Sequence, residues 1–279
     1  MGKSDVELDG FENYLFEQGN REKTIEDYIR HINNFHKWLQ SEGSDLEQLT
    51  RYDVQQYIKH LQDKGNKATT INPKFSAIVA YARYLGQSHL VENIQRPGIR
   101  HTRHISPKSL PRGDRNRMFR ELERSGNLRS IAIAYLLLYT GLRVSELTAL
   151  NREDVHMGER SGNVMVRDGK GGIARTVPLP SEARYHLRRF LEIRKDDDPA
   201  LFLSNFKKRI SVRAVQRIFE KLGFHAHMLR HTYGRELVSS GVDIATVAEL
   251  MGHSDVNVTR RYAAPSMKDL EQAVEKVFG

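Results

Sequence analysis

The 279-residue sequence contains no cysteine, which excludes disulfide bonds, thiolate metal ligands and a cysteine nucleophile. It also lacks any apolar run near the roughly 18 to 20 residues that a membrane-spanning helix needs, so no transmembrane segment is expected. The first residues, MGKSDVELDG, have neither the basic start nor the apolar stretch of a secretory signal. With 39% hydrophobic and 28% charged residues, the composition is typical of a globular protein, and we expect a cytoplasmic location.

The charge of the chain is unevenly distributed. The formal net charge is +9, yet residues 1–105 contribute none of it because 14 Lys and Arg balance 14 Asp and Glu. The excess is concentrated in residues 96–124, with nine cations and three acids, and in residues 207–235, with eight cations and one acid. Such clusters suit a polyanion-binding face, since each neutralised phosphate releases counterions. A solvated basic surface is the alternative interpretation.

Hydrophobic periodicity predicts that residues 1–95 form a bundle of about four helices. In the segment TIEDYIRHINNFHKWLQ the apolar side chains recur at three- and four-residue steps, which places them on one helical stripe. Thr50 followed by Asp53 is typical of a helix N-cap. A further helix is predicted from about residue 69 to residue 85, with Pro73 tolerated because it falls in the first turn.

The rest of the chain is predicted to be a basic linker followed by a second, mainly helical domain. Residues 96–110 have no apolar period and are rich in proline and in Lys and Arg, so they either lie along nucleic acid or simply join two bodies. Residues 111–279 form the second domain. In it, NVMVRDGKGGIARTVPLP alternates apolar and polar residues around glycine turns, which predicts a small antiparallel hairpin. Helices are predicted at 112–125, 128–139, 181–194, 211–222, 227–240, 244–251 and 266–277.

Two arginines of the second domain are placed to bind phosphate. Arg143 follows a Thr-Gly break between two helices, and its guanidinium could contact two phosphate oxygens at once. Glu146, three residues on, lies on the same helical face and could orient it, although a purely structural Arg–Glu pair is the alternative. His227 and Arg230 also stand three apart on a predicted helix and would give a second guanidinium beside an imidazole. His231 is interpreted as a buried, hydrogen-bonded helix residue rather than a catalyst.

A lysine, a histidine and a tyrosine complete the candidate site. Lys170 lies at the tip of the hairpin between glycines and could deliver a proton to a leaving oxygen, or be only an exposed turn lysine. His253 follows a Met-Gly break, and Tyr262 comes nine residues later. The phenol has a pKa near 10, so it would attack poorly unless nearby cations favour the phenolate or a base takes its proton, and the crowded positive charge favours the first route. A half-buried packing tyrosine is the alternative. Zinc is not expected, because the spacing of the histidines is not HExxH.

In this order, TGLRVSEL, GKGGIARTVPL, HMLRHTYGREL, ELMGHS and the late Tyr262 resemble the motifs of the tyrosine site-specific recombinase family, of the Xer or transposon-resolvase type. The resemblance implies a mainly helical two-domain clamp, with a SAM-like core-binding bundle and a catalytic domain that has a small antiparallel sheet. It implies that Tyr262 is the nucleophile and Lys170 the general acid. It further implies that His227 assists proton transfer. The residues implied to bind the scissile phosphate are Arg143, Arg230 and His253.

The family resemblance also implies the reaction and the partners. Tyr262 would cleave double-stranded DNA through a 3′-phosphotyrosyl intermediate, without metal, ATP or other cofactor, and four protomers would act on two sites through a Holliday junction. The last helix would dock on a neighbouring protomer, or else pack on its own domain; its apolar residues at helical spacing are Leu270, Ala273, Val274 and Val277. A type IB topoisomerase and a DNA-binding regulator that has lost cleavage are the alternative functions. The sequence does not specify the DNA site or the choice between integration, excision and resolution.

Overall fold

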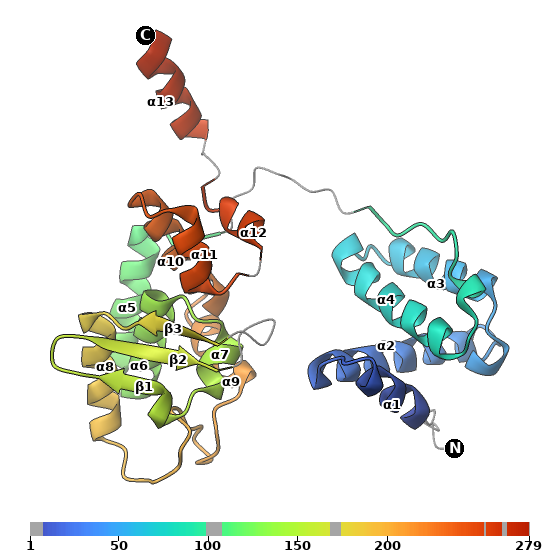
Figure 1. Cartoon of the computed structure of the whole chain (residues 1–279), viewed down its shortest axis with the longest axis horizontal. Helices are drawn as coiled ribbons and strands as arrows, with labels where there is room; N and C mark the ends of the chain where they lie inside the picture. The colour runs from blue at the N-terminus through green and yellow to red at the C-terminus, as the bar shows by residue number, and fades with distance from the viewer. Residues whose placement is uncertain (1–7, 99–107, 168–173, 254, 264–266, 279) are drawn as a thin grey trace. The chain divides into compact units, whose positions relative to one another are not determined.

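The computed structural model describes residues 8–98, 108–167, 174–253, 255–263 and 267–278, and it is drawn in Figure 1. The chain divides into two compact units, Met1–His101 and Thr102–Gly279. The boundary falls inside the segment predicted as a linker. Among the described residues, no helix is both long and apolar enough to cross a membrane.

The first unit is a helical bundle, as the periodicity predicts. Its α-helices within the described residues are α1 (Asp9–Glu17), α2 (Glu22–Ser41), α3 (Arg51–Asp63) and α4 (Ala68–Tyr84). Short 3-10 turns follow α2 and α4, at Leu46–Gln48 and Ser88–Leu90. The apolar stripes meet in one core that includes the fully buried Phe11, Ile32, Phe35 and Ile78. The bundle therefore forms because each helix buries one face against the others.

Two local details of this unit test the sequence reasoning. Thr50 and Asp53 form the expected capping box at the start of α3: Asp53 N donates to Thr50 Oγ1 at 3.2 Å and Thr50 N donates to Asp53 Oδ2 at 2.9 Å. Pro73, however, is the sixth residue of α4 and not part of its first turn, so that expectation was wrong. The helix tolerates it because the carbonyl left without an N–H donor belongs to Thr69, which is exposed and can be hydrated.

The second unit is mainly helical with one small sheet, which confirms the predicted fold class. The sheet has the order β1-β2-β3, is antiparallel throughout, and pairs Val164 with Val155 on one side and with Val177 on the other. Figure 1 shows its strands side by side. The strands are β1 (Val155–Met157), β2 (Gly162–Val166) and β3 (Arg175–Pro178). The helices are α5 (Arg112–Ser125), α6 (Leu128–Thr140), α7 (Val144–Ala149), α8 (Ser181–Glu192), α9 (Val212–Glu220), α10 (Ala226–Ser239), α11 (Ile244–Met251), α12 (Val256–Arg260) and α13 (Met267–Phe278), with a 3-10 turn at Arg152–Asp154.

Helix α6 is the centre of this unit. It is apolar on nearly all sides, with Ile131, Ile133 and Leu136 fully buried, and it packs against α8, α10 and α5. It ends at Gly141, which has φ +62° and allows the chain to turn directly into α7. A Cβ at Gly141 would lie 2.3 Å from Tyr233 Cδ1 on α10, so only glycine fits this close approach. The C-terminal end of α6 thus packs closely against the middle of α10, where the candidate site begins.

Candidate active site

Arg143 stands at the N-terminus of α7 and is fixed there by Glu146. The Arg143 backbone N donates to Glu146 Oε2 at 2.7 Å, and Arg143 Nη1 donates to Glu146 Oε1 at 2.6 Å. At the other end of α7, Arg209 Nη1 donates to the carbonyls of Thr148, Ala149 and Leu150 at 2.9 to 3.1 Å. Both ends of this six-residue helix are therefore satisfied by side chains. A short helix that could not persist alone thereby becomes a rigid mount for Arg143.

Three arginines converge on the C-terminal end of α11. Arg175 Nε donates to Leu250 O at 3.2 Å, Arg230 Nη2 to Met251 O at 2.6 Å, and Arg143 Nη2 to Gly252 O at 2.9 Å. These carbonyls have no partner within the helix and carry its partial negative charge, so they suit guanidinium donors. Three consecutive carbonyls at the end of α11 thereby bring together arginines from three distant segments of the chain.

Arg230 is the most enclosed of these cations. Its residue is 2% exposed, and its Nη1 also donates to Gly141 O at 2.5 Å, at the end of α6. Burial, together with the charge of Arg143, lowers its pKa to about 10, so it remains a cation at neutral pH. Of its five N–H donors, two are engaged by these carbonyls, and the others remain to bind a ligand. A buried cation with spare donors, held before any anion arrives, is preorganised for phosphate.

Glu146 is the counter-charge of the cluster. Its side chain is 3% exposed, and besides the Arg143 bonds it accepts from Arg175 Nη1 at 3.0 Å and from Arg175 Nη2 at 2.9 Å. Burial raises the pKa of the carboxyl, but the hydrogen bonds from Arg175 and Arg143 outweigh burial and hold the pKa at about 2. Arg175, the first residue of β3, is therefore the second partner of Glu146. One carboxylate orients both guanidinium groups.

The tyrosine and the histidines gather beside these arginines. His231 Nδ1 lies 2.8 Å from Tyr262 Oη, and the His253 ring stacks parallel to the Tyr262 ring with centroids 6.3 Å apart. His253 Nδ1 is held in turn by Thr259 Oγ1 at 2.7 Å. The His227 ring meets the His231 ring edge-on at 4.3 Å. Of the sequence candidates, Arg143, His227, Arg230, His253 and Tyr262 thus come from four helices and their loops into one cluster.

Tyr262 is more buried than the sequence indicates. It is 6% exposed and packs with Val247 and Met251 in a small apolar cluster. Burial raises the pKa of its phenol more than Arg230, Arg261 and Arg143 lower it. Of the two routes to the phenolate, surrounding positive charge therefore does not suffice in this structure, because burial outweighs it. The attacking oxygen needs a group that takes its proton.

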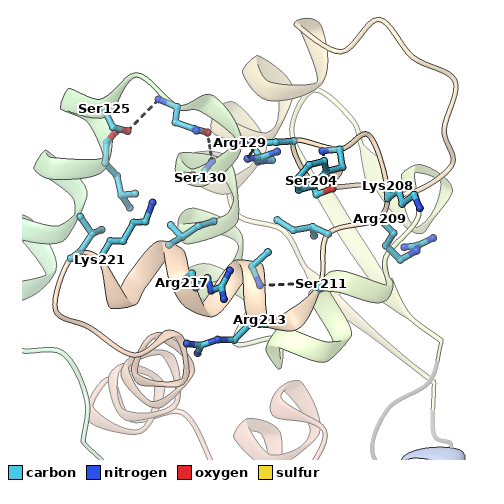
Figure 2. A pocket seen from close by; sticks show the side chains of 18 of the residues that line it. Ser125, Arg129, Ser130, Ser204, Lys208, Arg209, Ser211, Arg213, Arg217 and Lys221 are labelled. Atoms are coloured by element: carbon cyan, nitrogen blue, oxygen red, sulfur yellow. Dashed lines mark hydrogen bonds between the residues drawn. The ribbon is translucent and has the colours of Figure 1, made fainter.

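Two pockets lie on either side of α9. On one side, Arg143 and His227 line a pocket with Val212, Gln216 and Glu220 of α9. On the other, a larger pocket opens between α9, the 204–211 loop and the facing ends of α5 and α6, and Figure 2 shows it from close by. Its walls carry six cations: Arg129, Lys208, Arg209, Arg213, Arg217 and Lys221. We call this surface the basic pocket.

The cations of the basic pocket divide into structural and free ones. Arg129 and Arg209 are committed to backbone carbonyls, and Arg213 pairs with Glu220 at 2.6 Å. Within the described residues, the side chains of Lys208, Arg217 and Lys221 have no hydrogen-bond or ion-pair partner. Positive charge left unpaired on a concave surface is available to an external polyanion.

Known proteins are similar in sequence to both units. A model of the phage integrase family matches residues 108–269, and a model of its N-terminal SAM-like domain matches residues 8–89. The chain belongs to the phage integrase family. It is 32% identical to the tyrosine recombinase XerA of Pyrococcus furiosus over 96% of this chain and 93% of that protein. It is 29% identical to the TnP I resolvase of Bacillus thuringiensis over 95% of this chain and 97% of that protein.

Solved structures of this family share the fold. The chain superposes on a XerH recombinase bound to its difH substrate with a TM-score of 0.69, 19% identity and coverage of 98% of this chain and 85% of that one. A lambda integrase tetramer bound to a Holliday junction gives a TM-score of 0.71 at 19% identity, over 91% and 75% of the two chains. The chain therefore has the family fold, a SAM-like helical bundle plus a mainly helical domain. Its membership of the family and its 32% identity to XerA identify its activity as site-specific DNA recombination.

Lys170, the predicted general acid, lies outside the described residues. Three interactions were not predicted from the sequence. They are the hydrogen bond between His231 and Tyr262, the ion pair between Glu146 and Arg175, and the hydrogen bond between Thr259 and His253. One signal was present: His231 stands four residues after His227, so both face the same side of α10. The other contacts join residues far apart in the chain and leave no local pattern.

Proposed function

We propose that Tyr262 is the nucleophile of a strand-transfer reaction that needs no metal and no nucleotide cofactor. Its Oη attacks a DNA phosphate, forms a 3′-phosphotyrosyl bond and releases a 5′ hydroxyl; the 5′ hydroxyl of the partner strand then reverses the step. The bond energy stays in the phosphotyrosine, so ATP is not required. The observation that carries this proposal is the gathering of Arg143, Arg230 and His253 around the Tyr262 side chain.

Arg143, Arg230 and His253 would bind the non-bridging oxygens of the scissile phosphate. Their anchoring on the α6 and α11 ends supports this role, because donors that are already oriented need no reorganisation when charge develops on the phosphate. Loss of one such donor typically slows the reaction about 100- to 1,000-fold. Lys170 would protonate the departing 5′ oxygen, and His227 would assist proton transfer, both as the family motif implies.

The DNA duplex would be held by both units, as in the clamp that the sequence predicts. In the second unit, we assign the basic pocket to contacts with the phosphate backbone of DNA, because its cations Lys208, Arg217 and Lys221 are unpaired among the described residues. The pocket also lies across α9 from the one that Arg143 and His227 line. Since its substrate is chromosomal or mobile DNA, we expect the protein to be associated with the nucleoid.

Recombination would require four protomers on two DNA sites, passing through a Holliday junction. Helix α13 is the proposed link between them. Val274, Val277 and Phe278 on this helix are 58%, 71% and 84% exposed, which leaves apolar side chains available to a partner. A neighbouring protomer would cover them. The lambda integrase tetramer on a Holliday junction, which shares the fold, gives the model for this assembly.

One experiment tests the nucleophile and finds the DNA site together. The wild-type protein and the Tyr262→Phe variant are incubated with fragments of the genome that carries this gene, and DNA that stays bound in detergent is sequenced. The wild-type protein should enrich one site with inverted half-sites, whereas Tyr262→Phe should bind the same fragment reversibly and retain none. A detergent-stable adduct in the variant would refute the assignment. Efficient relaxation of a plasmid without that site would favour a type IB topoisomerase instead.

A further inference from the structure

The hydroxyl of Tyr262 already has a hydrogen-bonding partner, and the family motif does not assign that partner a role. His231 Nδ1 lies 2.8 Å from Tyr262 Oη, and the two residues are 31 positions apart in the chain. The His227 ring lies edge-on to the His231 ring at 4.3 Å. His227 is exposed, His231 is half-buried and Tyr262 is buried. The three side chains therefore form a continuous series of contacts from the surface to the attacking oxygen.

We propose that His231 accepts the proton of Tyr262 through Nδ1 during cleavage and returns it during rejoining; this assignment rests on the proposed function. In cleavage the Oη–H bond breaks toward His231, the Oη–P bond forms, and the P–O5′ bond breaks as the leaving oxygen takes a proton from the general acid. In rejoining the 5′ hydroxyl attacks phosphorus and loses its proton to the conjugate base that the acid became in cleavage. The Oη–P bond breaks, and Tyr262 recovers its proton from His231.

The charge around His231 supports this assignment. Burial and the positive charge of His227, Arg230, Arg261 and His253 lower the pKa of its imidazole to about 4, so the ring is neutral at pH 7 and has a lone pair to accept a proton. Among the described residues, these groups and Tyr262 are the titratable and charged side chains that act on His231. A bound phosphodiester brings negative charge among the same cations and raises the basicity of His231. The base therefore strengthens when the substrate is in place.

The other histidines are less well placed for this step. His253 already uses its Nδ1 with Thr259 Oγ1, at 2.7 Å. For His227, the only ring contact recorded in the described residues is with His231, and no hydrogen bond joins it to Tyr262. His231 thus contacts the reacting oxygen directly, whereas His227 contacts only the far side of this pair, toward the surface.

The first test needs no DNA. Histidine nitrogens of the full-length wild-type protein are observed by nitrogen-15 NMR at pH 7, with His231→Asn used for assignment. The proposal requires the Nε2–H tautomer of His231, because Nδ1 must be free to accept from the phenol. Its Nδ1 shift should change in Tyr262→Phe, which lacks the donor. An Nδ1–H tautomer would mean that the imidazole donates to Oη, and it would overturn the proposal.

The second test measures covalent adduct formation in single turnover on the genomic fragment captured with the wild-type protein. His231→Asn can still hydrogen-bond Oη but cannot take its proton, so adduct formation should slow about 100- to 10,000-fold at pH 7 while affinity for the fragment is unchanged. The rate should rise with pH in the variant, as hydroxide replaces the base. His156→Asn, on the exposed part of β1, is the matched control and should react like the wild type.

The outcomes separate the two proposals. If His231→Asn forms the adduct at the wild-type rate, His231 only positions the tyrosine and its role as proton acceptor is refuted. If added imidazole restores part of the rate to His231→Ala, the missing function is proton transfer, as proposed. If the wild-type protein forms no adduct on any fragment, or Tyr262→Phe still forms one, the proposed function itself fails, whatever His231 does.

Discussion

Glu146→Gln should destabilise the second unit strongly, although the substitution removes only a charge. The carboxylate is 3% exposed and accepts hydrogen bonds from Arg143 and Arg175. Its pKa is depressed from 4.5 to about 2, which corresponds to about 3 kcal/mol of folding free energy at 1.36 kcal/mol per pKa unit. The same magnitude is expected when one partner of a buried ion pair is removed and the other charge is left alone.

The depressed pKa fixes the pH dependence of this effect. Because the carboxyl is more acidic in the folded protein, its contribution is fully present above the unfolded pKa, near 4.5, and is lost as the pH falls toward 2. The wild type should therefore lose about 3 kcal/mol of stability in the second unit between pH 5 and pH 2 from this group. Glu146→Gln should lack that component, so the two proteins should become more alike in acid.

Peptide-resolved hydrogen exchange across a urea series measures the effect in the intact chain. Peptides from α7 and α10 report on the second unit, while the single tryptophan, Trp38 on α2, reports by fluorescence on the first unit and should be unchanged. Glu153→Gln is the matched control: Glu153 also pairs with an arginine, but its side chain is 66% exposed, so the loss should stay below about 1 kcal/mol. A loss in Glu146→Gln no larger than in this control would refute the reasoning.

Two further predictions concern a glycine and the basic pocket. Gly141 and Gly126 both follow the last residue of a helix and have positive φ, +62° and +64°, but a Cβ would meet Tyr233 at 2.3 Å only at Gly141. Gly141→Ala should therefore lower the free energy of unfolding, measured by thermal unfolding, by about 1 to 3 kcal/mol more than Gly126→Ala does. Equal losses would contradict the close approach. Replacing Lys208, Arg217 and Lys221 by glutamine should weaken binding to the captured DNA and reduce the slope of log binding constant against log salt concentration by about 2 to 3. The control Lys195→Gln lies outside the basic pocket and should change the slope little. An unaltered slope in the triple variant would show that the basic pocket is not part of the DNA interface.

Periodicity and end signals were sufficient for most helices because those patterns are local. The predicted bounds of α5 and α11 match the structure at both ends, and the Thr50–Asp53 cap forms as expected. Helix α12 and strand β1 were not predicted, because five and three residues are too short to show a period. Their existence depends on what they pack against.

The sequence by itself determined the two-domain helical plan and the family, and it proposed the phosphate-binding residues, since motifs in a fixed order are readable without coordinates. The tertiary structure alone decided how those residues are held. Glu146 joins Arg143 to Arg175, the α11 carbonyls align three arginines, and His231 reaches Tyr262 across 31 positions. It also decided that burial, not positive charge, governs the Tyr262 phenol. Burial and long-range hydrogen bonds arise only when distant segments pack, so no local pattern in the chain encodes them.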